Sequence, residues 1–245
     1  MKTYNKTLVV ALLILSGMSG KAEVLKALAT NKTLARQPNQ QFIKVALLLD
    51  TSNSMDGLID QARAQLWGIV NELSYAKCGT SKPNLEIALY EYGNDHLNNR
   101  EGFIRQKLNF SNDLDEISKQ SFSLTTNGGN EYCSQVINTS INQLNWGKNE
   151  DDLKLIFIAG NEPFSQGKIS YKNAAKLACK NDVSVNTIFC GDYEQGIATY
   201  WKDGADLGGG NYMTINHNQA TNLSWITKIY RLSSKVNHLL KSRLT

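Results

Sequence analysis

Apolar and polar residues alternate along this chain in blocks that predict strands and helices in turn. Residues 42–49 are nearly all apolar, which is typical of a strand covered on both faces. Over 57–76 the apolar residues recur every three or four positions, which predicts an amphipathic helix. By the same patterns, further strands are expected at 85–93, 102–110, 153–160, 183–191 and 211–216, and helices at 111–120, 131–146, 170–181, 193–206 and 220–241.

This order of elements predicts the fold class. Strands that alternate with helices favour an α/β fold with a doubly wound, mostly parallel central sheet and helices on both faces. The polar loop between 85–93 and 102–110 is short enough for a hairpin, so we expect one antiparallel hairpin edge strand. The pattern contains no internal repeat and no second domain. We expect a single domain over 42–245, with its C-terminal helix included.

The first residues have a different pattern, that of a targeting segment. Lys2 and Lys6 precede an apolar run over 8–15, and small residues lead to Ala22. This order predicts a secretory signal peptide over 1–22 and a periplasmic or secreted protein. A membrane anchor or a buried helix is the alternative, but the apolar run is less than half of the ~20 residues that span a bilayer. Residues 23–41 are predicted to be a polar leader.

Export would change the charge of the protein. The chain has 26 basic and 22 acidic side chains, and without Lys2, Lys6 and Lys21 it keeps 23 basic ones. A protein so close to neutrality has no electrostatic case for binding nucleic acid. We therefore expect no nucleic-acid partner, and no membrane span once the signal peptide is cleaved.

Candidate chemistry begins where the first apolar strand ends. Asp50-Thr51-Ser52-Asn53-Ser54 presents a carboxylate, three hydroxyls and an amide in five positions. Such residues are common at helix N-caps, and they are also oxygen ligands for a metal. Polar loops at 127–131, 160–162 and 190–192 are expected at the same edge, because parallel strands bring their carboxyl ends together.

The stretch Leu-Leu-Leu-Asp-Thr-Ser-Asn-Ser-Met (47–55) resembles the metal-ion-dependent adhesion site, Asp-x-Ser-x-Ser, of the von Willebrand factor type A (VWA) family. The order of elements over about 42–240 agrees with that family. The resemblance implies that Asp50, Ser52 and Ser54 bind Mg²⁺ or another divalent cation. It also implies a protein partner that offers an acidic side chain to the metal.

Two positions depart from the family pattern. The loop that should supply a threonine has Asn130 or Glu131 nearest the matching place, and Gly160 stands where a second aspartate is usual. Either Glu131 or Glu162 replaces the missing oxygen ligands, with help from Asn161, or the site is degenerate. The candidate site residues are therefore Asp50, Ser52, Ser54, Asn130, Glu131, Asn161 and Glu162.

The function predicted from these features is an exported VWA-like protein-binding module. The alternatives are a metal-dependent hydrolase that uses Asp50 and a structural scaffold with a vestigial metal site. An Asp-x-Asp phosphatase motif, a glycine-rich nucleotide loop after the first strand and a Gly-x-Ser-x-Gly elbow are all missing. We therefore expect that the protein is not an enzyme.

Four cysteines, Cys78, Cys133, Cys179 and Cys190, form no Cys-x-x-Cys pair, so zinc-ligand spacing is absent. In an oxidising compartment disulfides are expected, with buried free thiols as the alternative. Cys133 lies in the first turn of a helix that starts at the carboxyl-end edge of the sheet. Cys190 ends the fifth strand at the same edge. This topology predicts a Cys133–Cys190 disulfide, whereas Cys78 and Cys179 belong to the opposite end of the sheet on opposite faces.

Overall fold

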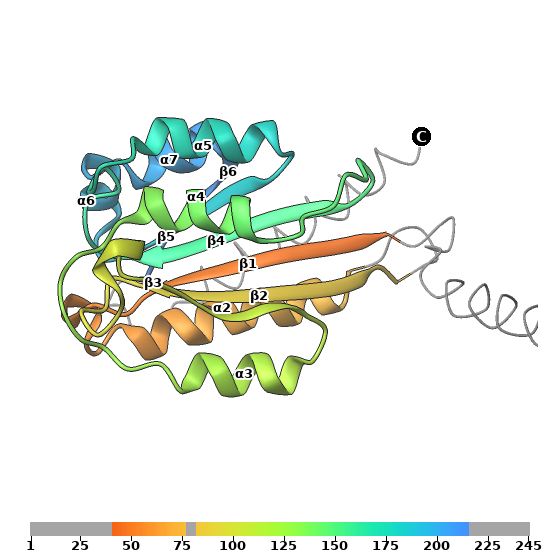
Figure 1. Cartoon of the computed structure of the whole chain (residues 1–245), viewed down its shortest axis with the longest axis horizontal. Coiled ribbons are helices and arrows are strands. Elements are labelled where there is room, and N and C mark those ends of the chain that lie inside the picture. Colours follow the sequence, from red (N-terminus) through yellow and green to blue (C-terminus); the bar gives the residue numbers. More distant parts are fainter. Residues whose placement is uncertain (1–40, 77–81, 216–245) are drawn as a thin grey trace, which may run out of the picture. The chain divides into compact units, whose positions relative to one another are not determined.

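Six strands form one sheet in a computed structural model that describes residues 41–76 and 82–215 (Figure 1). The strand order is β3-β2-β1-β4-β5-β6, and β1 lies parallel to both of its neighbours. The pairs β4–β5 and β5–β6 are parallel as well, whereas β2 and β3 are antiparallel. The strands are β1 (Phe42–Asp50), β2 (Asn84–Tyr92), β3 (Ile104–Ser111), β4 (Leu153–Gly160), β5 (Ser184–Cys190) and β6 (Gly209–Ile215).

Helices cover both faces of this sheet (Figure 1). They are α2 (Ile59–Ser74), α3 (Leu114–Phe122), α4 (Cys133–Gln143), α5 (Tyr171–Lys180), α6 (Tyr193–Ala198) and α7 (Trp201–Leu207), with single 3₁₀ turns η1 (Asn53–Met55) and η2 (Asn99–Glu101). Helices α2 and α3 lie on one face, and α4, α5 and α7 on the other. The predicted doubly wound sheet with one antiparallel edge strand is confirmed.

Alternating side chains of the buried strands divide the core into two layers. In β1, Ile43, Val45, Leu47 and Leu49 pack toward α2, and Ala46 and Leu48 pack toward α4. All six are at most 2% exposed. Because both faces are buried, the strand is a nearly continuous apolar run, and that run is the pattern visible in the sequence.

The prediction of one continuous helix over 193–206 is wrong, because this segment forms two helices. It divides into α6 and α7 at Thr199 and Tyr200. The carbonyl of Thr199 accepts a hydrogen bond from the Phe164 amide at 2.9 Å, and Tyr200 has a left-handed backbone with φ of 70°. A left-handed residue cannot continue a right-handed helix, so the chain turns there.

The predicted Cys133–Cys190 disulfide is also wrong. Both residues are buried free thiols. Cys190 packs in the layer under α2 and Cys133 in the layer under α4, so the sheet separates them. Adjacent strand residues point to opposite faces, so Phe189 rather than Cys190 faces the α4 layer.

The predicted signal peptide, nearly all of the polar leader and the helix expected over 220–241 lie outside the described residues. Within 41–76 and 82–215, no helix has the length and apolarity that a membrane span requires.

Candidate functional site

The candidate site lies at the carboxyl-end rim, which is the edge of the sheet where β1, β2, β4 and β5 end. Asp50, Tyr92 and Gly160 are the last residues of three adjacent strands. The serine loop after β1 is held to the loop before α4 by two backbone hydrogen bonds, Asn53 N to Gly128 O and Asn127 N to Thr51 O, both 2.9 Å. Two loops that are distant in the sequence are thereby joined at one rim.

Asp50 is fully buried at the centre of this rim. Its Oδ1 accepts a hydrogen bond from the Ser52 amide at 2.9 Å, whereas its Oδ2 has no hydrogen-bond partner among residues 41–76 and 82–215. Burial raises the pKa of Asp50 from 3.8 to about 7, and the nearby negative charges of Glu131 and Glu162 add to this shift. In the described part of the chain, Asp50 therefore presents a buried acceptor atom to which no side chain or backbone amide donates.

Ser52, Ser54 and Asn161 form a chain of hydrogen bonds beside Asp50. The two serine hydroxyls are 2.9 Å apart, and Ser54 Oγ donates to Asn161 Oδ1 at 2.8 Å. Asn161 Nδ2 donates back to the Ser54 carbonyl at 2.9 Å. The loops after β1 and β4 are thus connected through side chains that the sequence had singled out.

Glu131 approaches the same place from the loop before α4. It is only 3% exposed, and its Oε2 accepts a hydrogen bond from Gln166 Nε2 at 3.2 Å. A Cβ atom on Gly93, which has φ of 80°, would lie 2.8 Å from Asp50 Oδ1 and 2.9 Å from Glu131 Cγ. Asp50 and Glu131 therefore flank one glycine, and only glycine leaves room for both.

The charge at Glu131 is poorly compensated. Burial raises the pKa of Glu131, and the negative charge of Glu162 adds to the increase, although hydrogen bonds from Gln166 and Ser52 oppose it. The charge of Glu162 therefore acts on both Asp50 and Glu131 at the rim. In the part of the chain that the structure describes, no group of three or more His, Cys, Asp or Glu side chains could by itself hold a metal ion.

The other two predicted residues lie differently. The side chain of Asn130 is bonded to residues outside the cluster of Asp50, Ser52, Ser54 and Asn161. Its Nδ2 donates to Asp95 Oδ1 and its Oδ1 accepts from the Tyr132 hydroxyl, both at 3.3 Å. The backbone carbonyl of Glu162 accepts from Trp201 Nε1 at 2.7 Å, which ties the loop after β4 to α7. Asn130 is thus bonded outside the serine cluster, whereas Glu162 acts on Asp50 through its charge.

Tyr92 is a site residue that the sequence analysis missed. Its hydroxyl donates to the Ala159 carbonyl at 3.1 Å and lies 3.5 Å from Cys133 Sγ. A Cβ atom on Gly160 would lie 2.5 Å from this hydroxyl and 2.9 Å from Asp50 Oδ2. Position 160 therefore has no room for any side chain. Tyr92 falls within an apolar strand pattern, so nothing local in the sequence distinguishes it from a core residue.

Comparisons with known proteins bear on the fold. No family model and no curated protein matches the sequence. Among solved structures, the conserved hypothetical protein BatB from Bacteroides thetaiotaomicron superposes with a TM-score of 0.59 at 15% identity, over 80% of this chain and 98% of that one. The SpRpn10 VWA domain gives a TM-score of 0.57 at 15% identity, over 76% and 94% of the two chains.

A third solved structure has a metal. Proximal thread matrix protein 1 from the mussel byssus, with a zinc-occupied metal-ion-dependent adhesion site, superposes with a TM-score of 0.54 at 10% identity, over 79% of this chain and 46% of that one. Identities this low establish the fold and nothing finer. The described part of this chain has the fold of a von Willebrand factor type A domain.

Proposed function

We propose that this protein is an exported, non-catalytic binding module whose carboxyl-end rim engages a protein partner. Domains with this fold are commonly protein-interaction modules, and the solved structures similar to this chain include the pilus adhesin SpaC from Lactobacillus rhamnosus. The observation that carries the proposal is the cluster of Asp50, Ser52, Ser54 and Asn161 at the rim. Export rests on the signal-peptide pattern of residues 1–22.

Exposed apolar side chains near the rim support a protein as the partner. Two residues separate α6 from the end of β5, and the second of them, Asp192, caps the helix: its Oδ1 accepts from the amides of Glu194 and Gln195. Tyr193, Ile197 and Tyr200 on and after this helix are 44%, 36% and 48% exposed. Tyrosine is among the residues that dominate binding energy at protein interfaces.

A divalent cation is part of the proposal, because the residues present fit one. The hydroxyls of Ser52 and Ser54 and the carboxylates of Asp50 and Glu131 are all-oxygen ligands of the kind that Mg²⁺ prefers. Among the described residues no group donates a hydrogen bond to Asp50 Oδ2, so this oxygen is available as a ligand atom. When bound, such a cation would supply a coordination position for an acidic side chain of the partner.

Glu131 is the residue that compensates for Gly160 in this proposal. Gly160 cannot carry a carboxylate, because Tyr92 fills the space beside it. Glu131 brings a second carboxylate to Asp50 from the other side, across Gly93. Burial raises the pKa of Glu131, the negative charge of Glu162 adds to the increase, and a bound cation would favour the ionised carboxylate.

Calorimetric titration with Mg²⁺ and Mn²⁺ tests the metal. We expect binding to the parent protein, at least a tenfold loss for Glu131→Gln and no measurable binding for the double variant Ser52→Ala/Ser54→Ala. Ser74→Ala is the matched control, because Ser74 lies at the end of α2 and its Oγ donates to the Asn71 carbonyl rather than to a residue of the rim. No binding to the parent at millimolar metal would contradict the proposal and favour a vestigial site.

Export and partner binding have separate tests. N-terminal sequencing of the mature protein should begin near residue 23, and an intact Met1 would contradict export. Cross-linking in the envelope should capture a partner with the parent protein and much less with Tyr200→Ser. Equal capture by both would show that the rim is not the contact surface.

A further inference from the structure

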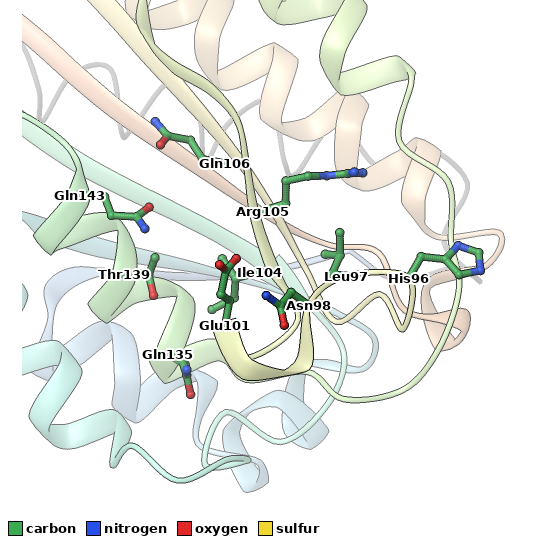
Figure 2. Close-up of a pocket in the computed structure, with 10 residues that line it drawn as sticks. All are labelled: His96, Leu97, Asn98, Glu101, Ile104, Arg105, Gln106, Gln135, Thr139 and Gln143. Carbon is green, nitrogen blue, oxygen red and sulfur yellow. The ribbon is translucent and has the colours of Figure 1, made fainter.

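A polar groove of about 620 Å³ lies beside β3, and its lining residues do not include those of the serine cluster (Figure 2). Its floor is the start of β3, with Ile104 and Gln106, and η2 closes one end. One wall is α4, where Gln135, Thr139 and Gln143 are four residues apart and so share one face of the helix. This volume is typical of ligand sites in proteins.

The lining favours a neutral ligand rich in hydrogen-bonding groups. Three glutamines and a threonine are among its ten lining residues, and a glutamine side chain has both a carbonyl acceptor and an amide donor, as a peptide group does, although the Gln143 carbonyl already accepts from the Tyr90 hydroxyl. The charged groups do not form a cluster of one sign: Glu101 is acidic, and Arg105 Nε donates to the buried carboxylate of Glu91. Neither a phosphate nor a metal ion would be held by this set.

The strand that forms the floor of the groove, β3, is an edge strand of the sheet in the described part of the chain. Strand β3 is the last in the strand order, and its partner among the described residues is β2. The β2–β3 ladder is regular from Ile104 to Gln106, beside the groove, and irregular beyond it. Backbone groups on the outer side of this regular stretch have no strand partner in residues 41–76 and 82–215, so they could pair with an added strand.

We propose that an extended peptide segment of a partner protein adds to the outer edge of β3 at Ile104–Gln106 and places alternate side chains over the groove. Addition of a strand to a sheet edge is a recurrent mode of peptide recognition, in which main-chain hydrogen bonds give affinity and pockets for alternate side chains give specificity. This surface is distinct from the serine cluster and does not depend on metal.

The charges along this edge indicate the composition of the segment. Arg100 on η2 and Lys107 on β3 are basic, whereas Arg105 is paired with Glu91 and Glu101 is acidic. A second copy of the same strand would bring like charges together, which is unfavourable across paired strands. We therefore expect a segment with neutral residues on the groove face and acidic residues on the alternate face.

Two synthetic peptides test this on the full chain. Acetyl-(Thr-Glu)₅-amide has strand-forming neutral residues on one face and carboxylates on the other, and acetyl-(Thr-Lys)₅-amide is its charge-reversed control. We expect the first to bind with a Kd below 1 mM in EDTA and the second at least tenfold more weakly. Hydrogen exchange should show new protection of the amides of residues 104–107.

Two variants on the same helix locate the binding. Thr139→Trp fills the groove and should weaken binding of the Thr-Glu peptide at least tenfold, whereas Asn142→Trp, on an exposed position outside the groove, should leave it unchanged. Lys107→Glu should weaken binding severalfold. Thermal melts report whether each variant is folded.

The outcomes separate this proposal from the proposed function. Failure of the Thr-Glu peptide to bind, equal binding of both peptides, or binding unaffected by Thr139→Trp would overturn it. So would binding of maltopentaose in the groove without binding of the peptide. Peptide binding is measured in EDTA, so these results do not depend on Mg²⁺. The double variant Ser52→Ala/Ser54→Ala, which should lose Mg²⁺ binding, should bind the peptide as the parent does.

Discussion

At the scale of single residues, Asp50 carries the largest electrostatic cost at the rim. Its pKa rises from 3.8 to about 7 on folding because the carboxylate is buried. A carboxyl group with a raised pKa favours the folded state when protonated. Its contribution is fully present below pH 3.8 and is lost as the pH rises to about 7.

Asp50→Asn should therefore change stability in a pH-dependent way. In EDTA we expect the variant to be more stable than the parent by roughly 2–4 kcal/mol at pH 8, since each pKa unit corresponds to about 1.4 kcal/mol. At pH 4 the difference should nearly vanish. Urea unfolding at both pH values measures it, with Asp151→Asn, on an exposed turn, as the control. An equal effect at both pH values would contradict the assigned cause.

Gly160 and Tyr92 form a second residue-scale pair. Gly160→Ala should destabilise the protein by about 1–3 kcal/mol, because the new methyl group would overlap the Tyr92 hydroxyl and crowd Asp50. Tyr92→Phe removes that hydroxyl and should recover part of the loss. A double-mutant cycle in denaturant measures the coupling. Strictly additive effects would show that Tyr92 does not fill the space beside position 160.

At the scale of elements, α3 depends on its N-terminal cap. Asp113 Oδ1 accepts from the amides of Asp115 and Glu116, both at 3.1 Å, and Ile117 on this helix is fully buried under the sheet. The cap positions the helix that closes this edge of the core.

Asp113→Ala should lower the free energy of unfolding by about 1 kcal/mol, which is typical for loss of an N-cap. Asp115→Ala is the matched control: it removes the same charge from the first turn and leaves both cap bonds intact, so only a few tenths of a kcal/mol are expected. Denaturant midpoints measure both. A larger effect for Asp115→Ala would contradict the capping role.

At the scale of the whole molecule, the two core layers keep Cys133 and Cys190 apart. Both thiols are buried, and burial raises the pKa of each, so thiolate is scarce at neutral pH. Cys179 is exposed.

Alkylation followed by peptide mapping should therefore label Cys179 in the native protein, and Cys133 and Cys190 only after unfolding without reductant. Protection that persists in denaturant until reductant is added would reveal a disulfide and contradict the free thiols.

The pattern of apolar residues was sufficient for the fold class. Burial on both faces leaves a continuous apolar run in β1, and a helix buried on one face leaves a stripe, so local spacing indicates both element type and order. The position of Asp50, Ser52 and Ser54 at the end of a strand followed in the same way. Parallel pairing then brought them to the edge where Asn161 lies, because parallel strands end together.

Strand register and side-chain direction, which only the tertiary structure decides, determine which side chains meet in the core and at the rim. Because neighbouring residues of β5 face opposite sides of the sheet, Phe189 lies in the α4 layer and Cys190 does not. The break between α6 and α7 occurs where the Thr199 carbonyl accepts a hydrogen bond from the Phe164 amide. Tyr92 meets Gly160 across β1, and Asn130 turns to Asp95. These contacts join residues distant in sequence. The sequence by itself determined which segments are buried and where polar groups follow strands, since both are local, whereas the choice of which side chains meet was made by long-range packing.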